Sequence, residues 1–249
     1  MPSVPAYLER ISYKGATTPN AANLCALHRA HMLAVPFENL DIKLGRTIIC
    51  DESSIINKIV DQGRGGFCYE LNGAFSALLR KLGFNVTLLS ARVARQDGTY
   101  GPEFDHLTLR VDLDEPWLAD VGFGDSFMEP LRLKVDIEQP QGQRNFRILE
   151  EAGSLHMEMA EAGAEWKREY SFTLTPRQLS DFSGMCHYHQ TSPQSSFTQK
   201  SVCSMGTPSG RITIADRKLI ITQDGERSES MLAEEEWQAA LKKYFEIVF

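Results

Sequence analysis

Apolar side chains recur at helical spacing through the first third of the chain. Residues 20–33 place them on one face behind Asn20, a residue type that caps helix N-termini. A shorter helix is expected over 51–61, beginning near Asp51. The most regular stripe stops before Gly83 and has its apolar side chains at positions 68, 71, 75, 78, 79 and 82. The first third is therefore predicted to be helical.

After Asn85 the pattern changes to the two-residue alternation of β-strands. The alternation is clearest in 105–113, where leucine and valine share one face and His106 lies on the other. The strands expected in this part of the chain cover 86–93, 105–113, 117–124, 130–135, 144–150, 154–160 and 165–174. The middle third is therefore predicted to be mostly β.

The last third mixes both patterns. Residues 175–195 are polar and rich in turn formers, and 199–225 suggest strands joined by glycine-containing turns. The apolar spacing over 232–248 indicates a final helix. Helices first, strands next and a mixture last form a block order rather than a βαβ alternation, so the pattern predicts an α+β fold class.

Composition narrows the classes of function. The 249 residues suit one large domain or a few small ones, and 42% hydrophobic and 24% charged residues are ordinary for a soluble globular protein. A net charge of −7 argues against a nucleic-acid binder that works by bulk attraction to phosphate. No apolar run approaches the ~20 residues of a transmembrane helix, and the first residues lack a signal-peptide pattern. We therefore expect a cytoplasmic protein with neither a membrane nor a nucleic acid as its partner.

The cysteines fit the same location. The chain has five, an odd number without an export signal, which favours reduced thiols. No C-x-x-C pair is present, so a cysteine-based zinc site is not expected, and we predict no metal cofactor.

One cysteine stands out by its position. Cys68 follows Gly65 and Gly66 and begins the predicted helix, where unpaired backbone N–H groups favour a thiolate. Arg64 adds a positive charge nearby. The same cysteine also lies in phase with Leu71, as a small buried side chain would. From this segment alone, Cys68 is either a nucleophile or a core residue.

A thiol nucleophile needs a base, and the base needs an orienting group. We interpret His28 and His31 as surface or capping residues of the first helix, and His156 as a strand residue without an evident partner. Two further histidines lie in the polar segment 175–195. His106 remains as the candidate base, on the strand face opposite to the leucines.

Asp120 interrupts an otherwise apolar strand, and a buried aspartate is costly unless it is paired. If the strands that contain His106 and Asp120 form a hairpin, their even separation places both side chains on one face, as opposite or diagonal neighbours. The alternatives for Asp120 are a turn cap or an ion pair with Arg92 or Arg110.

With these residues in view, the chain resembles the arylamine N-acetyltransferases. The matching segments are YLERISY (7–13), LHRAHMLAVPFENLDI (27–42), RGGFCYELNGAF (64–75), DHLTLRV (105–111), ADVGFG (119–124), YHQTSPQSSF (188–197) and CSMGTPSG (203–210). The resemblance implies three parts, which are an N-terminal helical bundle with the nucleophile (1–84), a central β-barrel-like domain with the histidine and aspartate (85–190) and a C-terminal α/β lid (191–249).

The resemblance also implies a chemistry. Acetyl-CoA, as the acyl donor substrate, would acetylate Cys68, CoA would leave, and an arylamine, arylhydrazine or N-hydroxyarylamine would take the acetyl group. His106 would activate the thiol and Asp120 would orient the imidazole. Such an enzyme would act on small molecules in xenobiotic metabolism, either as a monomer or as a homo-oligomer.

Binding residues follow from the same resemblance. Phe123 would border the aromatic acceptor, with Gly124 beside it; the alternative for Phe123 is a core phenylalanine. Thr207 and its glycine-rich turn match a stretch that lies against CoA in the family, and the loop 101–105 would line the same cleft. Because the chain is acidic overall, a polyanionic donor would need local help from Lys200, Arg211 or backbone amides.

Other functions fit the same three residues. A thiol hydrolase, such as a peptidase or a transglutaminase-like enzyme, would use water or a protein amine as the acceptor. An amide synthase on the same scaffold would close a ring on a polyketide. A module that has kept the fold without the activity is disfavoured, because Cys68, His106 and Asp120 are all present.

Overall fold

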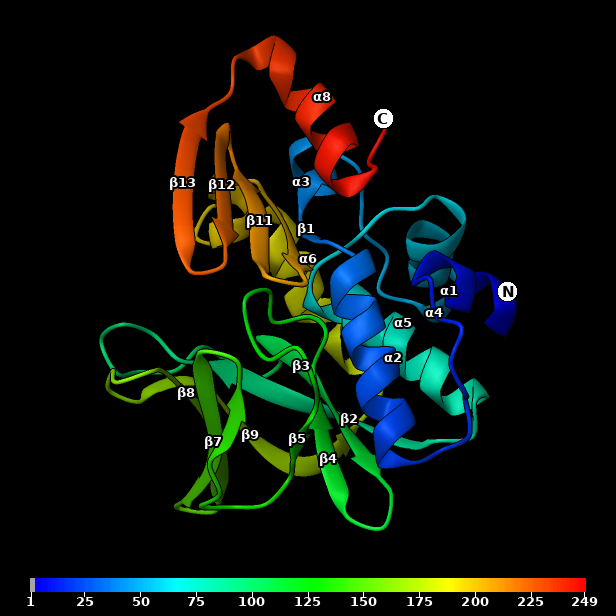
Figure 1. Cartoon of the computed structure of the whole chain (residues 1–249), viewed down its shortest axis with the longest axis vertical. Helices are drawn as coiled ribbons and strands as arrows, with labels where there is room; N and C mark the ends of the chain where they lie inside the picture. Colours follow the sequence, from blue (N-terminus) through cyan, green and yellow to red (C-terminus); the bar gives the residue numbers. More distant parts are fainter. Residues whose placement is uncertain (1–2) are drawn as a thin grey trace.

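Two β-sheets, with helices between and beside them, make up the fold in this computed structural model, which describes residues 3–249 (Figure 1). The α-helices are α1 (Val4–Arg10), α2 (Ala21–Ala34), α3 (Leu40–Lys43), α4 (Glu52–Ile56), α5 (Cys68–Lys81), α6 (Ser183–Thr191), α7 (Ser196–Gln199) and α8 (Glu234–Phe245). A π-helical turn, Asn57–Asp61, extends α4, and a 3₁₀ turn, Leu179–Phe182, precedes α6.

Within the described residues, the larger sheet has eight strands in the order β5-β4-β3-β2-β9-β8-β7-β6. Its strands are β2 (Asn85–Val93), β3 (His106–Asp112), β4 (Pro116–Ala119), β5 (Leu131–Arg132), β6 (Gln139–Gln141), β7 (Arg144–Glu151), β8 (Ser154–Glu161) and β9 (Lys167–Arg177). All neighbouring pairs are antiparallel, so short turns and loops join most of them.

The larger sheet curls so that its edge strands, β5 and β6, come together and are joined by a side chain. Gln139 of β6 accepts a hydrogen bond from the backbone N–H of Arg132 of β5 at 2.7 Å and donates to the carbonyl of Arg132 at 3.1 Å. A bridge between Val135 and Ile148 joins the same two sides. The middle of the chain is therefore barrel-like, as the resemblance implied.

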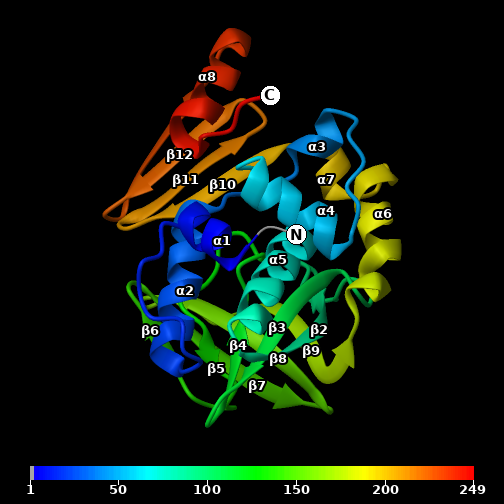
Figure 2. The same ribbon diagram turned by 90° about the vertical axis from the view of Figure 1, so that its right-hand side faces the viewer.

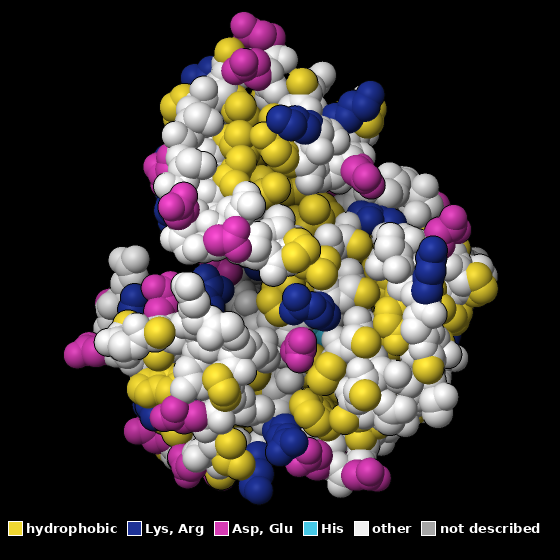
Figure 3. Space-filling model, viewed as in Figure 1, with side chains coloured by type: hydrophobic (Ala, Val, Ile, Leu, Met, Phe, Trp, Pro, Cys, Tyr) yellow, Lys and Arg dark blue, Asp and Glu magenta, His cyan; other side chains and the backbone are white. Residues whose placement is uncertain are grey.

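The smaller sheet carries the C-terminal part. Its order is β1-β10-β11-β12-β13, with β1 (Phe37–Glu38), β10 (Val202–Thr207), β11 (Gly210–Ala215), β12 (Lys218–Gln223) and β13 (Glu226–Met231). Leu241 and Phe245 of α8 pack on this sheet against Ile214 and Leu219. Figure 3 shows a notch between this upper part of the molecule and the barrel-like sheet below it.

Helix α5 runs through the middle of the helical part, where it packs against α4 and β3 (Figure 2). Every residue from Cys68 to Leu79 is buried, including the polar Glu70, Asn72 and Ser76. A helix that is buried on all sides must pair each of its polar side chains inside the protein. Those pairings build the site described below.

The predicted helices at 20–33, 51–61 and 68–82 are confirmed as α2, α4 with its π turn, and α5. The interpretation of 175–195 as turn-rich is wrong, because this segment forms the 3₁₀ turn and α6. Its helix buries only a narrow stripe, so its sequence stays polar.

The predicted α+β fold class is confirmed, whereas the boundaries after residues 84 and 190 stay predictions. Among the described residues, no helix combines the length and the apolar character that a bilayer span requires.

Candidate active site

The nucleophile candidate sits at the first position of α5, in a tightly built turn. Cys68 is only 4% exposed. A Cβ added at Gly65 would lie 1.9 Å from the carbonyl oxygen of Pro36, so only glycine allows this approach of two backbones. Glu70 accepts a hydrogen bond from the backbone N–H of Phe67 at 3.1 Å and thereby caps the helix. The predicted position of Cys68 at a helix start is confirmed.

The histidine and aspartate form a buried hydrogen-bonded pair. Strands β3 and β4 are antiparallel, with Leu109 opposite Ala119, so His106 and Asp120 are diagonal neighbours on one face. Nε2 of His106 lies 2.6 Å from Oδ2 of Asp120, and both side chains are almost completely buried. The hairpin geometry expected from the even separation is thus observed, and Nδ1 is the ring nitrogen left for another partner.

Asn72 ties the helix to this pair. Its Nδ2 donates to Oδ1 of Asp120 at 2.8 Å and to the carbonyl of Leu107 at 2.6 Å, and its Oδ1 accepts from the N–H of Val121 at 2.9 Å. Sequence reasoning missed this residue. The available signal was its position four residues after Cys68, which places both on one helix face.

Cys68 meets the same hairpin through the backbone. The backbone N–H of Leu107, the residue after His106, acts on the sulfur and lowers the pKa of the Cys68 thiol. A Cβ added at Gly122, two residues after Asp120, would lie 2.8 Å from Cα of Cys68. The structure therefore brings the three predicted residues into one buried region, where α5 and the β3–β4 hairpin touch.

Burial dominates the electrostatics of this region. It raises the pKa of the Cys68 thiol well above its ordinary value, and the N–H of Leu107 works against that rise. Burial also works to raise the pKa of Asp120, but His106 and the hydrogen bonds from Asn72 and the N–H of Gly122 outweigh it and hold the pKa below its ordinary value. Asp120 is therefore an anion, while a lone Cys68 thiolate is disfavoured.

The predicted binding residues lie in the loop after Asp120 and at the end of β10. The ring of Phe123 packs edge-on against His106, with ring centroids 5.1 Å apart. Gly124 follows it with a φ of +92°, which glycine adopts without strain. Thr207 lies at the end of β10, and the neighbouring Gly206 packs against Met128 of the loop that follows Asp120.

The loop 101–105 lies beside the nucleophile. The hydroxyl of Tyr69, the residue after Cys68, donates to the carbonyls of Phe104 and Asp105 at 2.8 and 3.2 Å. Arg211 pairs with Asp125 at 3.0 Å, and Arg144 pairs with the same carboxylate.

The interpretation of three other histidines is wrong. His28 and His31 are both completely buried rather than on the surface. They fall at positions that continue the apolar stripe of Leu24, which was the signal available in the sequence. His156 does have a partner, because its Nδ1 lies 2.8 Å from the hydroxyl of Tyr100.

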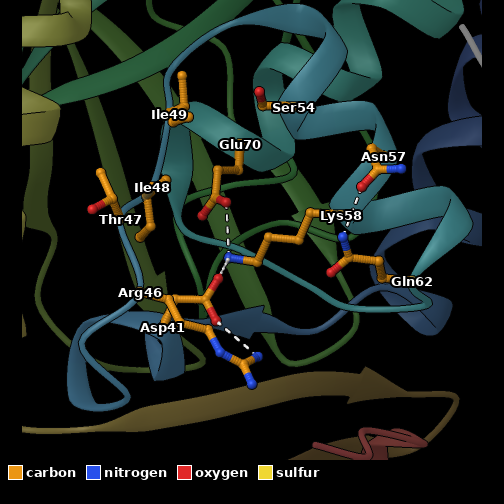
Figure 4. A pocket seen from close by; sticks show the side chains of 10 residues that line it. All are labelled: Asp41, Arg46, Thr47, Ile48, Ile49, Ser54, Asn57, Lys58, Gln62 and Glu70. Atoms are coloured by element: carbon orange, nitrogen blue, oxygen red, sulfur yellow. Dashed lines mark hydrogen bonds and ion pairs between the residues drawn. The ribbon is translucent and has the colours of Figure 1, made fainter.

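A buried ion network supports the start of α5. Nζ of Lys58 lies 2.8 Å from both Glu70 and Asp41, and Arg64 pairs with Glu38 at 2.7 Å. A cavity of about 250 Å³ opens beside Lys58 (Figure 4). None of the three candidate catalytic residues lines this cavity. Among residues 3–249, no group of three or more His, Cys, Asp or Glu side chains is placed to hold a metal ion.

Comparisons with known proteins identify the family of this chain. A family model described as N-acetyltransferase matches residues 20–249. The pineal gland isozyme of arylamine N-acetyltransferase from Gallus gallus is 35% identical over 97% of this chain and 92% of its own length. The arylamine N-acetyltransferase of Escherichia coli (strain K12) is 37% identical over 82% of this chain and 73% of its own length.

The fold matches as well as the sequence. The structure of Mycobacterium marinum arylamine N-acetyltransferase in complex with CoA is similar with a TM-score of 0.91 and 30% identity, over 98% of this chain and 93% of that one. From the family match, the identities over most of the chain and the shared fold, we conclude that this protein is an acyltransferase and belongs to the arylamine N-acetyltransferase family.

Proposed function

We propose that this protein transfers an acetyl group from acetyl-CoA to an arylamine, arylhydrazine or N-hydroxyarylamine through a thioester on Cys68. The observation that carries this proposal is the 2.6 Å bond between His106 and Asp120 in a buried region that also contains Cys68. This arrangement provides a nucleophile, a base and an orienting anion at one place.

Charge balance explains why the three residues act together. Because burial disfavours a lone thiolate, the Cys68 proton must move to a group that stays close to the sulfur. Nδ1 of His106 is free for that proton, since Nε2 is bonded to Asp120. The resulting imidazolium is stabilised by the anionic Asp120, and the thiolate by the imidazolium.

The reaction then runs in two halves. The Cys68 thiolate attacks the carbonyl carbon of acetyl-CoA, and the backbone N–H of Cys68, at the start of α5, would stabilise the oxyanion. The C–S bond to CoA breaks, and His106 returns its proton to the leaving thiolate. In the second half the amine attacks the thioester, His106 takes a proton from the amine nitrogen, and Cys68 leaves as the thiolate.

Substrate contacts belong to the same proposal. Phe123 offers an aromatic face beside His106 for the acceptor ring. Arg144 and Arg211 both pair with the carboxylate of Asp125, and we assign to these two guanidinium groups the attraction of the donor phosphates. We keep Thr207 and Gly124 as binding residues, a cytoplasmic location and a role in xenobiotic metabolism as predictions.

Intact-mass measurement after incubation with acetyl-CoA tests the first half-reaction. We expect one acetyl group on Cys68, and none on the Cys68→Ser variant. Asp120→Asn should retain the fold and acetylate at least about a hundredfold more slowly, because the imidazole loses its orienting anion. A folded wild-type protein that stays unmodified would refute the thioester.

A panel of acceptors tests the second half-reaction. The acetylated protein is mixed with an arylamine, an arylhydrazine, water alone or a peptide amine, and release of the free thiol is followed. Rapid release by the arylamine or arylhydrazine supports the proposal. Release that is equally fast in water would indicate a thiol hydrolase instead, and indifference to simple arylamines would favour an amide synthase.

A further inference from the structure

His28 contacts both ends of the loop that carries Asp120. The ring is completely buried in α2, and its Nδ1 lies 2.9 Å from the carbonyl oxygen of Met128. Its Nε2 accepts a hydrogen bond from the backbone N–H of Asp120 at 3.2 Å. One side chain thus bridges residues 120 and 128, and none of the catalytic steps proposed above uses it.

These two bonds fix the protonation state of the ring. A carbonyl oxygen only accepts, so Nδ1 of His28 must carry a proton. A backbone N–H only donates, so Nε2 must be unprotonated. The ring is therefore neutral and confined to one tautomer, and burial agrees with this because it lowers the pKa of His28 to about 4.

Aromatic neighbours hold the ring in place. Phe127, from the same loop, stacks on His28 with ring centroids 5.7 Å apart and an interplanar angle of 22°. Phe75, from α5, meets it edge-on at 5.8 Å. His28 therefore lies between the helix that carries Cys68 and the loop that carries Asp120.

The backbone of Asp120 needs such a partner. The β3–β4 ladder ends at the pair of Leu109 and Ala119, so Asp120 lies one residue beyond the last paired position. Its carboxylate is hydrogen-bonded to His106 and Asn72, and its backbone N–H donates to His28. A buried N–H without a partner is costly, so loss of this bond would release the segment.

We propose that His28 is a positioning residue, which sets the orientation of Asp120 and, through it, of the His106 ring. This inference rests on the proposed function, because it assigns His28 a part in the same reaction. The hydrogen bond to the backbone of Asp120 is what distinguishes His28 from a histidine that is merely packed in the core.

His31 provides a matched control. It lies one turn further along α2, is equally buried and also packs against Phe75, with ring centroids 5.3 Å apart. Its Nδ1 contacts the hydroxyl of Tyr7 at 3.2 Å, so its hydrogen bond points to α1 instead of the Asp120 loop. A purely structural role would make the two histidines equivalent.

The experiment compares His28→Phe, His28→Gln and His31→Phe. Two readouts are measured on each folded variant, namely the single-turnover rate of Cys68 acetylation and the pH profile of Cys68 alkylation by iodoacetamide. We expect His28→Phe to acetylate about tenfold to a hundredfold more slowly, with a shifted alkylation profile, because Asp120 is misplaced. His28→Gln should recover part of the rate, since its amide offers a donor and an acceptor. His31→Phe should keep the wild-type rate and profile.

Equal rates and profiles for His28→Phe and His31→Phe would overturn the inference. Failure of the wild-type protein to acetylate would instead refute the proposed function, so the two failures are distinguishable.

If the His28 variants do not fold, ¹⁵N–¹H spectra of the wild-type imidazoles decide. We expect His28 to be neutral with its proton on Nδ1 at pH 7. A proton on Nε2 would overturn the inference, because that nitrogen could not accept from Asp120.

Discussion

Asn72 donates to one oxygen of the Asp120 carboxylate at 2.8 Å, while His106 bonds the other oxygen at 2.6 Å. The helix that starts with the candidate nucleophile thus also holds the acid that orients the candidate base. Because all three partners are buried, no water is available to replace any of these bonds. The geometry of the site is therefore a property of the core rather than of a surface loop.

Replacing Asn72 with alanine should cost both stability and activity. The change leaves the carbonyl of Leu107 and the N–H of Val121 without partners in a buried place, at about 1–3 kcal/mol for each group. We expect a loss of about 3 kcal/mol in the free energy of unfolding and a slower acetylation of Cys68. Ser76→Ala is the matched control, because Ser76 is equally buried on α5 but bonds only to the carbonyl of Gly73 at 2.8 Å. Urea unfolding curves that coincide for the two variants would contradict this account.

Local patterns were sufficient to predict the parts of the site that depend on one element or one hairpin. The start of α5 at Cys68 follows from the apolar stripe behind it, and the pairing of His106 with Asp120 follows from the parity of a hairpin. The bond from Asn72 depends on how α5 docks on β3, which no local period encodes. The same holds for His28, whose partners come from a loop about a hundred residues away.

Two elements, α6 and β13, could not be predicted from apolar patterns because few of their residues are buried. Segment 183–191 is polar and forms a helix all the same, because it buries little more than Cys186 and His189. Strand β13 was missed because every residue in it is exposed, so it carries no apolar alternation.

The stability of the protein should depend on pH through the two completely buried imidazoles of α2, His28 and His31. Burial lowers the pKa of His28 to about 4 and that of His31 well below its ordinary value of 6.5, and for His31 the nearby Arg10 and His28 lower it further. Between pH 6.5 and 4 the unfolded chain therefore binds more protons than the folded one, so the free energy of unfolding falls as the pH falls. For His28 the full difference is about 3 kcal/mol.

Replacing each imidazole with phenylalanine tests that dependence. His28→Phe and His31→Phe should each flatten the dependence of stability on pH over this window, as measured by urea unfolding at a series of pH values. Wild-type and variant curves that run parallel from pH 4 to 6.5 would show that the two imidazoles are not kept neutral by the fold.

Glu70 should give the opposite pH dependence. Burial raises the pKa of Glu70 to about 7. The positive charge of Lys58 opposes this rise, but Lys58 shares its charge with Glu38 and Asp41 and cannot cancel the effect of burial. The folded protein then holds a proton that the unfolded chain loses near pH 4.5. The stabilisation of the folded protein by this proton on Glu70 is complete below pH 4.5 and is lost as the pH rises through 7.

Glu70→Gln isolates this effect, because the amide oxygen can still cap the N–H of Phe67. We expect the variant to gain stability relative to the wild type between pH 5 and pH 8. Glu226→Gln, on the exposed strand β13, is the control and should show no such trend. A stability difference between Glu70→Gln and the wild type that does not change with pH would reject the raised pKa.

Gly122, two residues after Asp120, lies so close to α5 that it has no room for a side chain. A Cβ there would lie 2.8 Å from Cα of Cys68 and 2.7 Å from Nδ2 of Asn72, and backbone cannot move aside as a flexible side chain can. We expect Gly122→Ala to push the hairpin off the helix, with about 1–3 kcal/mol lost in stability and at least a tenfold slower acetylation.

Gly184→Ala is the control. Residue 184 has open space around an added Cβ and lies in α6, where alanine should stabilise the helix by about 0.5–1 kcal/mol. Thermal unfolding and acetylation rates of the two variants check both signs, and a Gly122→Ala protein with normal activity would mean that the contact between Cys68 and the hairpin is not needed for the chemistry.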